Sequence, residues 1–246
     1  MKNSTHLFKL VFIAILIITC NSCKKEDLIT LNISEKTLNY EDEYQIEAES
    51  NSLITYSVEN DYHAEVSESG LVKARYVGET NIILENAEDR KTFKIIVEPR
   101  YHLYPEPNVY FGESKSSIIN KFGWDFVETE STIGYENYSI SAPIIIFTFD
   151  DYDKLNGYAV MVNTAYSSSL ADFLMERYLV AGIDNDVFYF INGLSTASAS
   201  TAIMMELYNI SYWIVLYIPN PTTNKIFDMK KCSQKIKISK LFNELK

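Results

Sequence analysis

Apolar and polar residues alternate along residues 28–100 with a period of two, which is typical of half-buried β-strands. The alternation is clearest in residues 44–48, 54–58 and 93–97. Clusters of Ser, Asn, Asp and Glu separate these runs, and such clusters mark turns. The spacing predicts a small β-sandwich or barrel, and Gly70 and Gly78 stand at turns that need positive φ. Its core is expected to hold Val72, Ala74 and Ile82.

Beyond residue 107 the period changes, and two helices are predicted. The first follows Ser114, which can cap it, and stops at Gly123, a residue that favours the left-handed conformation of a helix end. Its apolar stripe consists of Ile118, Ile119 and Phe122. The second helix is predicted over residues 168–181, before Gly182. Its stripe consists of Leu170, Phe173, Leu174 and Tyr178.

Strands are predicted around the second helix, at residues 144–149, 157–162, 202–208 and 212–218, with a shorter one at 187–191. Polar residues 150–156 join the first two strands as a hairpin. This order favours an antiparallel sheet with helices on one face. Residues 112–123 also resemble the start of small outer-membrane lipoprotein domains of the barrel-assembly accessory type, which have two helices on a small antiparallel sheet.

These patterns predict a two-domain chain, in which an all-β sandwich precedes an α+β domain with an antiparallel sheet and two helices. Pro99 ends the last sandwich strand, and Pro105 and Pro107 make the following segment an extended, stiff linker. The predicted segments are the sandwich at 30–99, the linker at 100–107, the α+β domain at 108–223 and a tail at 224–246.

The first 22 residues have the layout of a secretory signal peptide. Lys2 and Lys9 flank its charged start, and residues 10–18 form an apolar run that is shorter than the roughly 20 residues needed to span a bilayer. Residues 18–23 resemble the lipobox of bacterial lipoproteins, in which cleavage precedes a cysteine that receives a diacylglycerol. The resemblance implies that Cys23 is lipidated.

A further resemblance implies where in the cell the protein is located. Residues 24–27 resemble the charged patch that follows the lipidated cysteine in Bacteroidetes lipoproteins bound for the cell surface. We expect residues 23–29 to form a lipidated tether that holds the protein on the outer membrane, exposed at the surface. A periplasm-facing position and a plain secreted protein are the alternatives. Cys20 is the rival modified residue, although Thr19 suits the position before cleavage less well than Ser22 does.

Four segments of the predicted sandwich follow a recognisable order: an aromatic before Ser, an Ala-x-Val strand, a Gly-x-Val-x-Ala hairpin and a Gly-x-x-x-Ile strand. They lie at residues 56–60, 64–67, 70–74 and 78–82. This order resembles the bacterial immunoglobulin-like domain of group 2. Tyr56 stands where the family usually has Trp, and His63 where an aliphatic residue is usual. The resemblance implies a seven-stranded sandwich that serves as a spacer or adhesive unit on bacterial surfaces, and it implies no enzyme.

The net charge of the chain narrows the range of partners. The formal net charge of −11 falls by a further two, to −13, when Lys2 and Lys9 leave with the signal. This acidic balance argues against nucleic acid as a partner, whose phosphates need clustered Lys and Arg.

With Cys20 cleaved off and Cys23 lipidated, only Cys232 remains, so no internal disulfide can form.

The tail at residues 224–246 reverses the sign of the charge. It carries seven lysines against Asp228 and Glu244, a net charge of +5. It can be a terminal strand or an arm lying on the acidic body, and we expect partial disorder.

The sequence carries no catalytic constellation. Asp150, Asp151 and Asp153 suggest a calcium loop, but the Gly and Glu that such a loop needs at its sixth and twelfth positions are absent. Ser195 lacks the second Gly of a nucleophile elbow. The paired carboxylates of a glycoside hydrolase would converge only in three dimensions. We therefore predict no catalytic residue, no metal site and no cofactor.

Aromatic residues near the linker and the first helix are the remaining signal. Tyrosine and tryptophan side chains can hold sugars by stacking on them, but aromatic residues also dominate cores and interfaces. The alternative is therefore a tyrosine-rich sheet and an interdomain contact. The ligand-binding candidates are Tyr101, Tyr104, Tyr110, Phe111 and Trp124.

The leading hypothesis is a non-enzymatic lipoprotein whose immunoglobulin-like module presents a C-terminal binding domain at the cell envelope. A surface glycan or an envelope protein would be its partner. One alternative is a hydrolase of glycans or peptides in residues 108–223, and another is an accessory subunit of an outer-membrane uptake or assembly complex. A pocket with paired acids would favour the hydrolase. A flat aromatic platform would favour ligand binding, and an exposed apolar patch would favour a protein partner.

Overall fold

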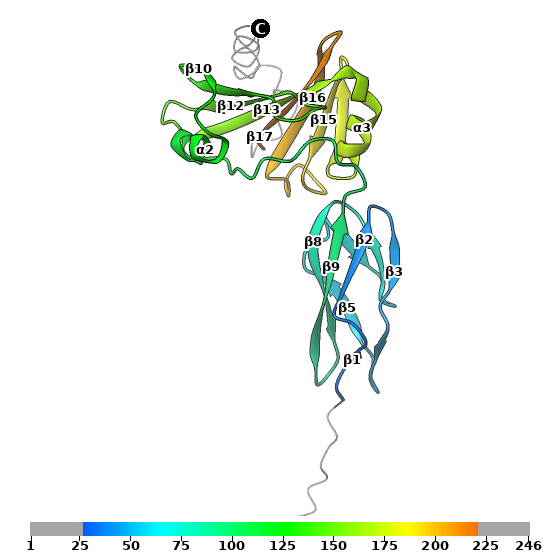
Figure 1. Ribbon diagram of the computed structural model, residues 1–246. Coiled ribbons are helices and arrows are strands. Elements are labelled where there is room, and N and C mark those ends of the chain that lie inside the picture. Colours follow the sequence, from blue (N-terminus) through cyan, green and yellow to red (C-terminus); the bar gives the residue numbers. More distant parts are fainter. Residues whose placement is uncertain (1–26, 221–246) are drawn as a thin grey trace, which may run out of the picture.

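The computed structural model of the chain describes residues 27–220. These residues are mostly β-sheet with two α-helices, and they form two parts (Figure 1). We call residues 30–98 the sandwich and residues 103–219 the sheet unit. The predicted signal peptide, the lipidation of Cys23 and most of the tether concern residues outside the described range, as does the tail at 224–246.

The sandwich consists of two facing sheets and one short strand pair. The first sheet has the order β2 (Glu35–Asn39), β9 (Arg90–Glu98), β8 (Gly78–Glu85) and β5 (Thr55–Val58). The second has the order β3 (Glu43–Gln45), β7 (Leu71–Ala74) and β6 (Ala64–Val66), and the pair is β1 (Thr30–Leu31) with β4 (Ala48–Glu49). Side chains from both sheets share one buried core, which includes Val72, Ala74 and Ile82. The predicted β-sandwich and these three core positions are confirmed.

The two predicted turn glycines have positive φ, at 81° for Gly70 and 141° for Gly78. A side chain at Gly70 would place its Cβ 2.8 Å from the ring of Tyr56. Because the turn and the ring both need this space, the hairpin requires glycine here.

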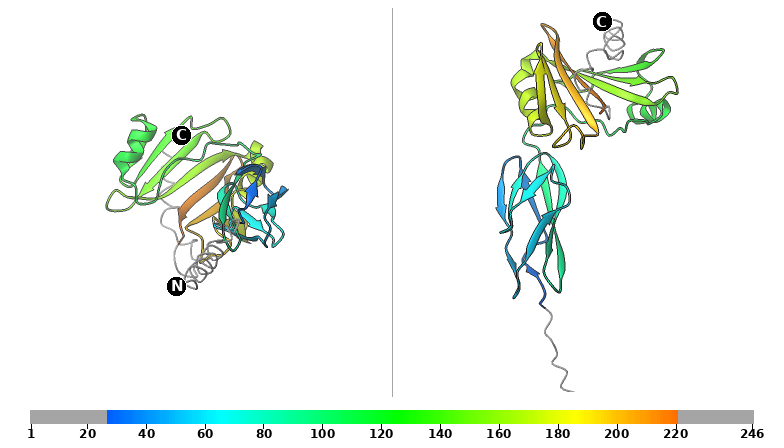
Figure 2. Two further views of the ribbon diagram at one scale, coloured as in Figure 1. Left: turned by 90° about the horizontal axis from the view of Figure 1, so that it is seen from below. Right: turned by 180° about the vertical axis from the view of Figure 1, so that it is seen from behind.

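The sheet unit contains one antiparallel sheet of eight strands (Figures 1 and 2). Its order is β10 (Val127–Thr129), β11 (Thr132–Glu136), β12 (Ile144–Phe149), β13 (Leu155–Asn163), β17 (Tyr212–Pro219), β16 (Thr201–Asn209), β15 (Val187–Ile191) and β14 (Leu179–Asp184). The five predicted strands correspond to β12, β13, β15, β16 and β17. The predicted polar hairpin joins β12 to β13, where the Asp150 carboxylate accepts hydrogen bonds from the N–H groups of Tyr152 and Lys154.

Both described helices pack on the same face of this sheet. Helix α2 (Lys115–Phe122) begins after Ser114, whose hydroxyl accepts the N–H of Ser117, and ends at Gly123 with φ of 97°. Helix α3 (Ser167–Met175) follows a short 3₁₀ turn, η1 (Thr164–Tyr166). Their apolar residues join one core cluster with alternate residues of the strands. Across residues 27–220, neither helix has the length and apolar character needed to cross a membrane.

The predicted second helix is wrong in its last turn and a half. Helix α3 ends at Met175, and the chain from Leu179 to Asp184 forms the edge strand β14. This strand pairs with β15 across a tight turn in which Asn185 and Asp186 both have positive φ. Pairing Leu179 and Val180 with the apolar strand β15 outweighs the helical spacing of Tyr178, because the two-residue turn fixes the hairpin. The sequence interpretation also missed the hairpin of β10 and β11.

The second half of the predicted linker packs against the core of the sheet unit. Tyr104 is 5% exposed, and its hydroxyl shares a 2.8 Å hydrogen bond with that of Tyr217. Leu103 packs against the same core. Burying an apolar residue and the aromatic residue after it against the sheet lowers the free energy more than leaving them in water.

Candidate functional site

Buried polar residues connect the sandwich to the sheet unit. Tyr62 and Val77 come from the sandwich, and Glu176 and Arg177 directly follow helix α3. The chain between the two parts adds backbone groups of Arg100 and Tyr101, and the start of the sheet unit adds the Glu106 carboxylate. We call the whole set the joint, and it consists of Tyr62, Val77, Arg100, Tyr101, Glu106, Glu176 and Arg177.

An ion pair lies at the centre of the joint. The side chains of Glu176 and Arg177 are 2% and 7% exposed, and Arg177 Nη1 is 2.5 Å from Glu176 Oε1. Arg177 Nε also contacts Glu106 Oε2 at 3.1 Å. The guanidinium carbon lies 3.8 Å from the ring centre of Phe173, a cation–π contact. Burial of these charges is tolerated because each finds an opposite charge or a hydrogen-bond partner.

Hydrogen bonds to the backbone tie this ion pair to the sandwich. The Glu176 carboxylate accepts the N–H groups of Arg100 and Tyr101 at 2.9 and 3.0 Å. The Glu176 carbonyl accepts the N–H of Val77 at 3.0 Å. The Tyr62 hydroxyl donates to the Arg177 carbonyl at 2.6 Å, and burial raises the pKa of Tyr62, which keeps it protonated. With these partners in place, the joint acts as a structural clamp.

A polar cleft of about 410 Å³ opens beside the joint. The sandwich contributes His63 and Asp61, and the loop between β15 and β16 contributes Ser198 and Ser200. Glu106 lines the cleft as well, and it accepts a hydrogen bond from the Tyr178 hydroxyl at 2.6 Å. The sequence interpretation assigned these residues to separate regions. No local pattern could have brought them together.

The histidine and the two serines of this cleft already make hydrogen bonds within the fold. His63 Nδ1 lies 3.0 Å from the carbonyl oxygen of Tyr76. The Ser198 hydroxyl bonds Ser195, and the Ser200 hydroxyl accepts from the Asn192 amide. A nucleophilic serine would need an adjacent base, and the bonds of these side chains do not supply that arrangement. The cleft therefore offers hydrogen bonds rather than a catalytic pair.

The structure separates the five predicted aromatic candidates. Tyr110 and Trp124 are 70% and 78% exposed, on either side of helix α2 in the sequence. Phe111 stacks on Tyr158, and Tyr101 lies half-exposed beside the joint. Tyr104 is buried in the core and does not lie at the surface with the other candidates. Its ring packs against the apolar face of the sheet, and the path of the linker places it there.

A groove of about 410 Å³ runs beside the end of helix α2. Pro105, Pro107, Phe122 and Tyr138 give it an apolar lining, and Lys121 lies at its margin. Burial, with the Glu106 charge nearby, raises the pKa of Tyr138 to about 12. The groove thus combines aromatic and proline surfaces with one cation, close to the exposed Tyr110.

Lys121 connects this groove to Tyr110 and to the start of the helix. Its ammonium lies 5.7 Å from the centre of the Tyr110 ring and 2.6 Å from Glu113 Oε1. Burial raises the pKa of Glu113, but hydrogen bonds from Lys121, Ser117 and Tyr110 outweigh this and hold the pKa below its ordinary value. Glu113 is therefore ionised at neutral pH and keeps Lys121 in place.

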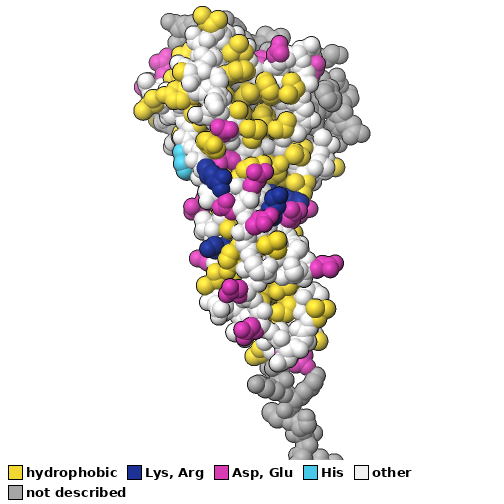
Figure 3. All heavy atoms as spheres, turned by 90° about the vertical axis from the view of Figure 1, so that its right-hand side faces the viewer, with side chains coloured by type: hydrophobic (Ala, Val, Ile, Leu, Met, Phe, Trp, Pro, Cys, Tyr) yellow, Lys and Arg dark blue, Asp and Glu magenta, His cyan; other side chains and the backbone are white. Residues whose placement is uncertain are grey.

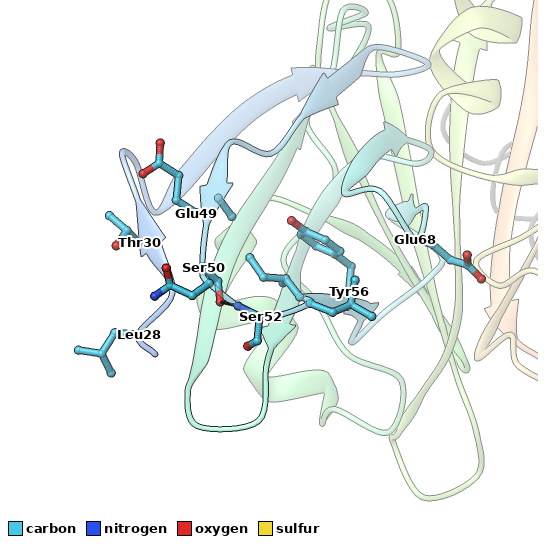
Figure 4. Close-up of a pocket in the computed structure, with 11 residues that line it drawn as sticks. Leu28, Thr30, Glu49, Ser50, Ser52, Tyr56 and Glu68 are labelled. Atoms are coloured by element: carbon cyan, nitrogen blue, oxygen red, sulfur yellow. Dashed lines mark hydrogen bonds between the residues drawn. The ribbon is translucent and has the colours of Figure 1, made fainter. Parts of the chain in front are cut away.

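Another groove, of about 760 Å³, lies on the sandwich at the end remote from the sheet unit. Figure 4 shows Tyr56 near its centre, Ser50 and Ser52 on its loop, and Leu28 and Thr30 on a separate segment. Its wall is mostly polar and open to solvent. It has no aromatic pair and no acid–base pair that would favour chemistry.

Two further features bear on the kind of partner. Figure 3 shows hydrophobic side chains gathered over the part of the sheet unit that carries α3. The exposed apolar residues in this region include Met175, Val180 and Ile183. Within residues 27–220, no group of three or more His, Cys, Asp or Glu side chains is placed to hold a metal ion.

Comparisons with known proteins add little to this geometry. No protein-family model matches the chain, and no curated protein matches it significantly. The C-terminal domain of TagH aligns at 14% identity over 68% of this chain and 97% of its own, with a TM-score of 0.29. The EC1-2 fragment of human protocadherin-24 aligns at 11% identity over 78% of this chain and 95% of its own, with a TM-score of 0.25. Scores this low carry no argument about function.

Proposed function

We propose that this protein is an exported lipoprotein of the outer membrane, attached through lipid on Cys23. Its immunoglobulin-like sandwich is a stalk, and its sheet unit is a separate α+β domain held away from the membrane at the cell surface. The domain binds an envelope partner and performs no catalysis.

The joint is the observation that carries this proposal. At one end of the sandwich, Val77 and Tyr62 donate hydrogen bonds to the carbonyls of Glu176 and Arg177 in the sheet unit. The buried Glu176 carboxylate also accepts the N–H groups of Arg100 and Tyr101 in the connecting chain, whereas a flexible tether between domains would need no such buried charge. Strand β1 lies at the opposite end (Figure 1). There the N–H of Asp27 donates to Glu88, and the Asn86 amide donates to the carbonyl of Asp27. Cys23 precedes Asp27 by four residues, so a lipid on it would attach the end of the stalk remote from the sheet unit.

Membrane attachment is tested by substituting the two candidate cysteines separately. The Cys23→Ala protein is expected to appear in the soluble fraction and to lose labelling by a palmitate analogue, because one residue carries the anchor. The Cys20→Ala protein is the matched control and is expected to remain membrane-bound and labelled. Membrane retention of Cys23→Ala, with its labelling intact, would contradict the proposed anchor.

The exposed aromatic residues beside α2 support a glycan as the ligand. Tyr110 and Trp124 are largely exposed on either side of α2 in the sequence, and Lys121, which lines the apolar groove, lies 5.7 Å from the centre of the Tyr110 ring. Sugars offer apolar C–H faces and hydroxyl groups, which match such a surface. The apolar residues around α3 favour a second candidate, a protein partner.

A glycan array probed with residues 24–246 tests the ligand class. We expect binding that falls about 5- to 150-fold in the Tyr110→Ala/Trp124→Ala protein, since each aromatic contact contributes about 0.5–1.5 kcal/mol. Tyr152→Ala is the control, because Tyr152 is equally exposed but lies on the hairpin between β12 and β13. Silence across the array would exclude the glycan and leave the protein partner.

A further inference from the structure

The face of the sheet opposite α2 and α3 is as apolar as the face they cover. Alternate residues of the central strands β12, β13, β15, β16 and β17 point to it and form a second cluster of buried residues. The cluster consists of Ile146, Ala159, Met161, Tyr189, Ile191, Ala202, Met204, Ile214, Leu216 and Ile218. We call this surface the second face.

Residues of the second face are at most 6% exposed. Within residues 27–220, the partly buried hydrophobic residues that pack against them come from the strands themselves and from the loop residue Ala199. Both described helices belong to the other cluster. Side chains on one face of a sheet shield one another only in part, and full burial requires a second layer about 10 Å away.

We propose that the segment of residues 221–246 covers the second face and packs its own apolar side chains against it. Strand β17, the fifth of eight in the sheet order, ends at Pro219. The segment therefore starts at the middle of the sheet, next to the surface that needs a cover.

The sequence of the segment has the pattern that this role requires. Its apolar residues near the end recur at i, i+3, i+4 and i+7, which is typical of one face of a helix. They are Ile238, Leu241, Phe242 and Leu245. Lys240 and Asn243 stand on the opposite side of the same period and would face water.

The length and the charge of residues 221–246 also fit a cover over the second face. Residues 221–234 can extend over roughly 46–50 Å, more than the length of β17, and can bring the rest of the segment back over the sheet. A helix of about 12 residues is roughly 18 Å long, close to the width of five strands spaced about 4.8 Å apart. Glu206 alternates with Met204 and so places a carboxylate on the second face, while the segment carries seven lysines.

Site-specific photo-crosslinking in the full chain tests the proposal. A benzophenone amino acid at Phe242 is expected to link to peptides of β13, β16 or β17 within one chain. The same group at Asn243 is the matched control and is expected to link to these peptides at least several-fold less. Links between two chains would assign the second face to another copy, and links to the sandwich would place the segment elsewhere. Either result would overturn the proposal.

Dye binding provides a second readout that does not depend on the crosslinker. The Leu241→Asp/Phe242→Asp protein is expected to increase the fluorescence of a hydrophobic dye several-fold, because the segment leaves the second face and exposes it. The Lys240→Asp/Asn243→Asp protein carries the same added acids on the polar side, and it is expected to match the wild type. Equal fluorescence of all three proteins would overturn the proposal.

Discussion

Replacing Glu176 with alanine is expected to lower the free energy of unfolding by about 3–5 kcal/mol, the cost typical of removing one partner from a buried ion pair. Arg177 would keep one carboxylate, Glu106, which is partly open to solvent, and its hydrogen bonds to the carbonyls of Phe173 and Tyr101. The N–H groups of Arg100 and Tyr101 would lose their shared acceptor. The cost therefore arises from a buried charge that loses its buried counter-charge and from two donors that lose their acceptor.

Denaturant unfolding followed by tryptophan fluorescence measures this effect. Both tryptophans, Trp124 and Trp213, lie in the sheet unit, so the signal reports the part of the protein that holds Glu176. Glu128→Ala is the control in the same part of the protein: Glu128 pairs with Lys115 at 3.1 Å, but its side chain is 57% exposed. Removing it is expected to cost less than about 1 kcal/mol, as for other surface pairs.

Small-angle scattering in native buffer separates the joint from general stability. The Glu176→Ala protein is expected to show a broader distribution of distances than the wild type, since the clamp between the two parts is weakened. Equal unfolding free energies for Glu176→Ala and Glu128→Ala, with unchanged scattering, would show that the joint is not a clamp. The stalk proposal would then lose its main support.

The sequence predicts the sheet unit well where local signals agree. Ser114, the apolar stripe ending at Phe122 and Gly123 all specify the same helix, and α2 has those bounds. Strand β12 likewise coincides with the predicted run at 144–149. In contrast, the residues after Met175 satisfy the helical period and the strand pattern together. The turn at Asn185 and Asp186 decides between them, and it was the signal that could have located β14.

The joint could not be predicted from the sequence. The carboxylate of Glu176 meets the N–H of Arg100 from a position 76 residues away, and Tyr62 meets Arg177 across 115 residues. Neither pair has a local pattern, because contacts of this kind depend on how two folded parts meet. The sequence also could not tell which aromatic candidates are buried and which are exposed. Composition could not separate the buried Tyr104 from the exposed Tyr110.

The Gly78→Ala protein is expected to lose roughly 2–5 kcal/mol of stability through two separable effects. A Cβ at Gly78 would lie 2.2 Å from His63 Cε1, and the ring must move to admit it. This overpacking costs about 1–3 kcal/mol. The φ of 141° adds backbone strain of about 1–2 kcal/mol for any residue other than glycine.

Two further variants separate these contributions. Gly112 has φ of 86° and nothing within 4 Å of its virtual Cβ, so Gly112→Ala measures backbone strain alone. His63→Ala removes the ring, and the His63→Ala/Gly78→Ala protein is expected to recover the overpacking part. Because the sandwich holds no tryptophan, the sandwich transition is followed by circular dichroism. Additive costs of the two single substitutions would rule out the steric coupling between Gly78 and His63.

This coupling matters for the joint because both residues adjoin it. Val77, directly before Gly78, donates its N–H to the Glu176 carbonyl, and Tyr62, directly before His63, donates its hydroxyl to the Arg177 carbonyl. A ring displaced by the new Cβ would shift these two donors. Gly78→Ala is therefore expected to broaden the scattering distribution as Glu176→Ala does, and Gly112→Ala is expected to leave it unchanged. Removal of the His63 ring in the double variant is expected to restore the narrower distribution, because the new Cβ then meets no ring, and Tyr62 and Val77 keep their positions against the sheet unit.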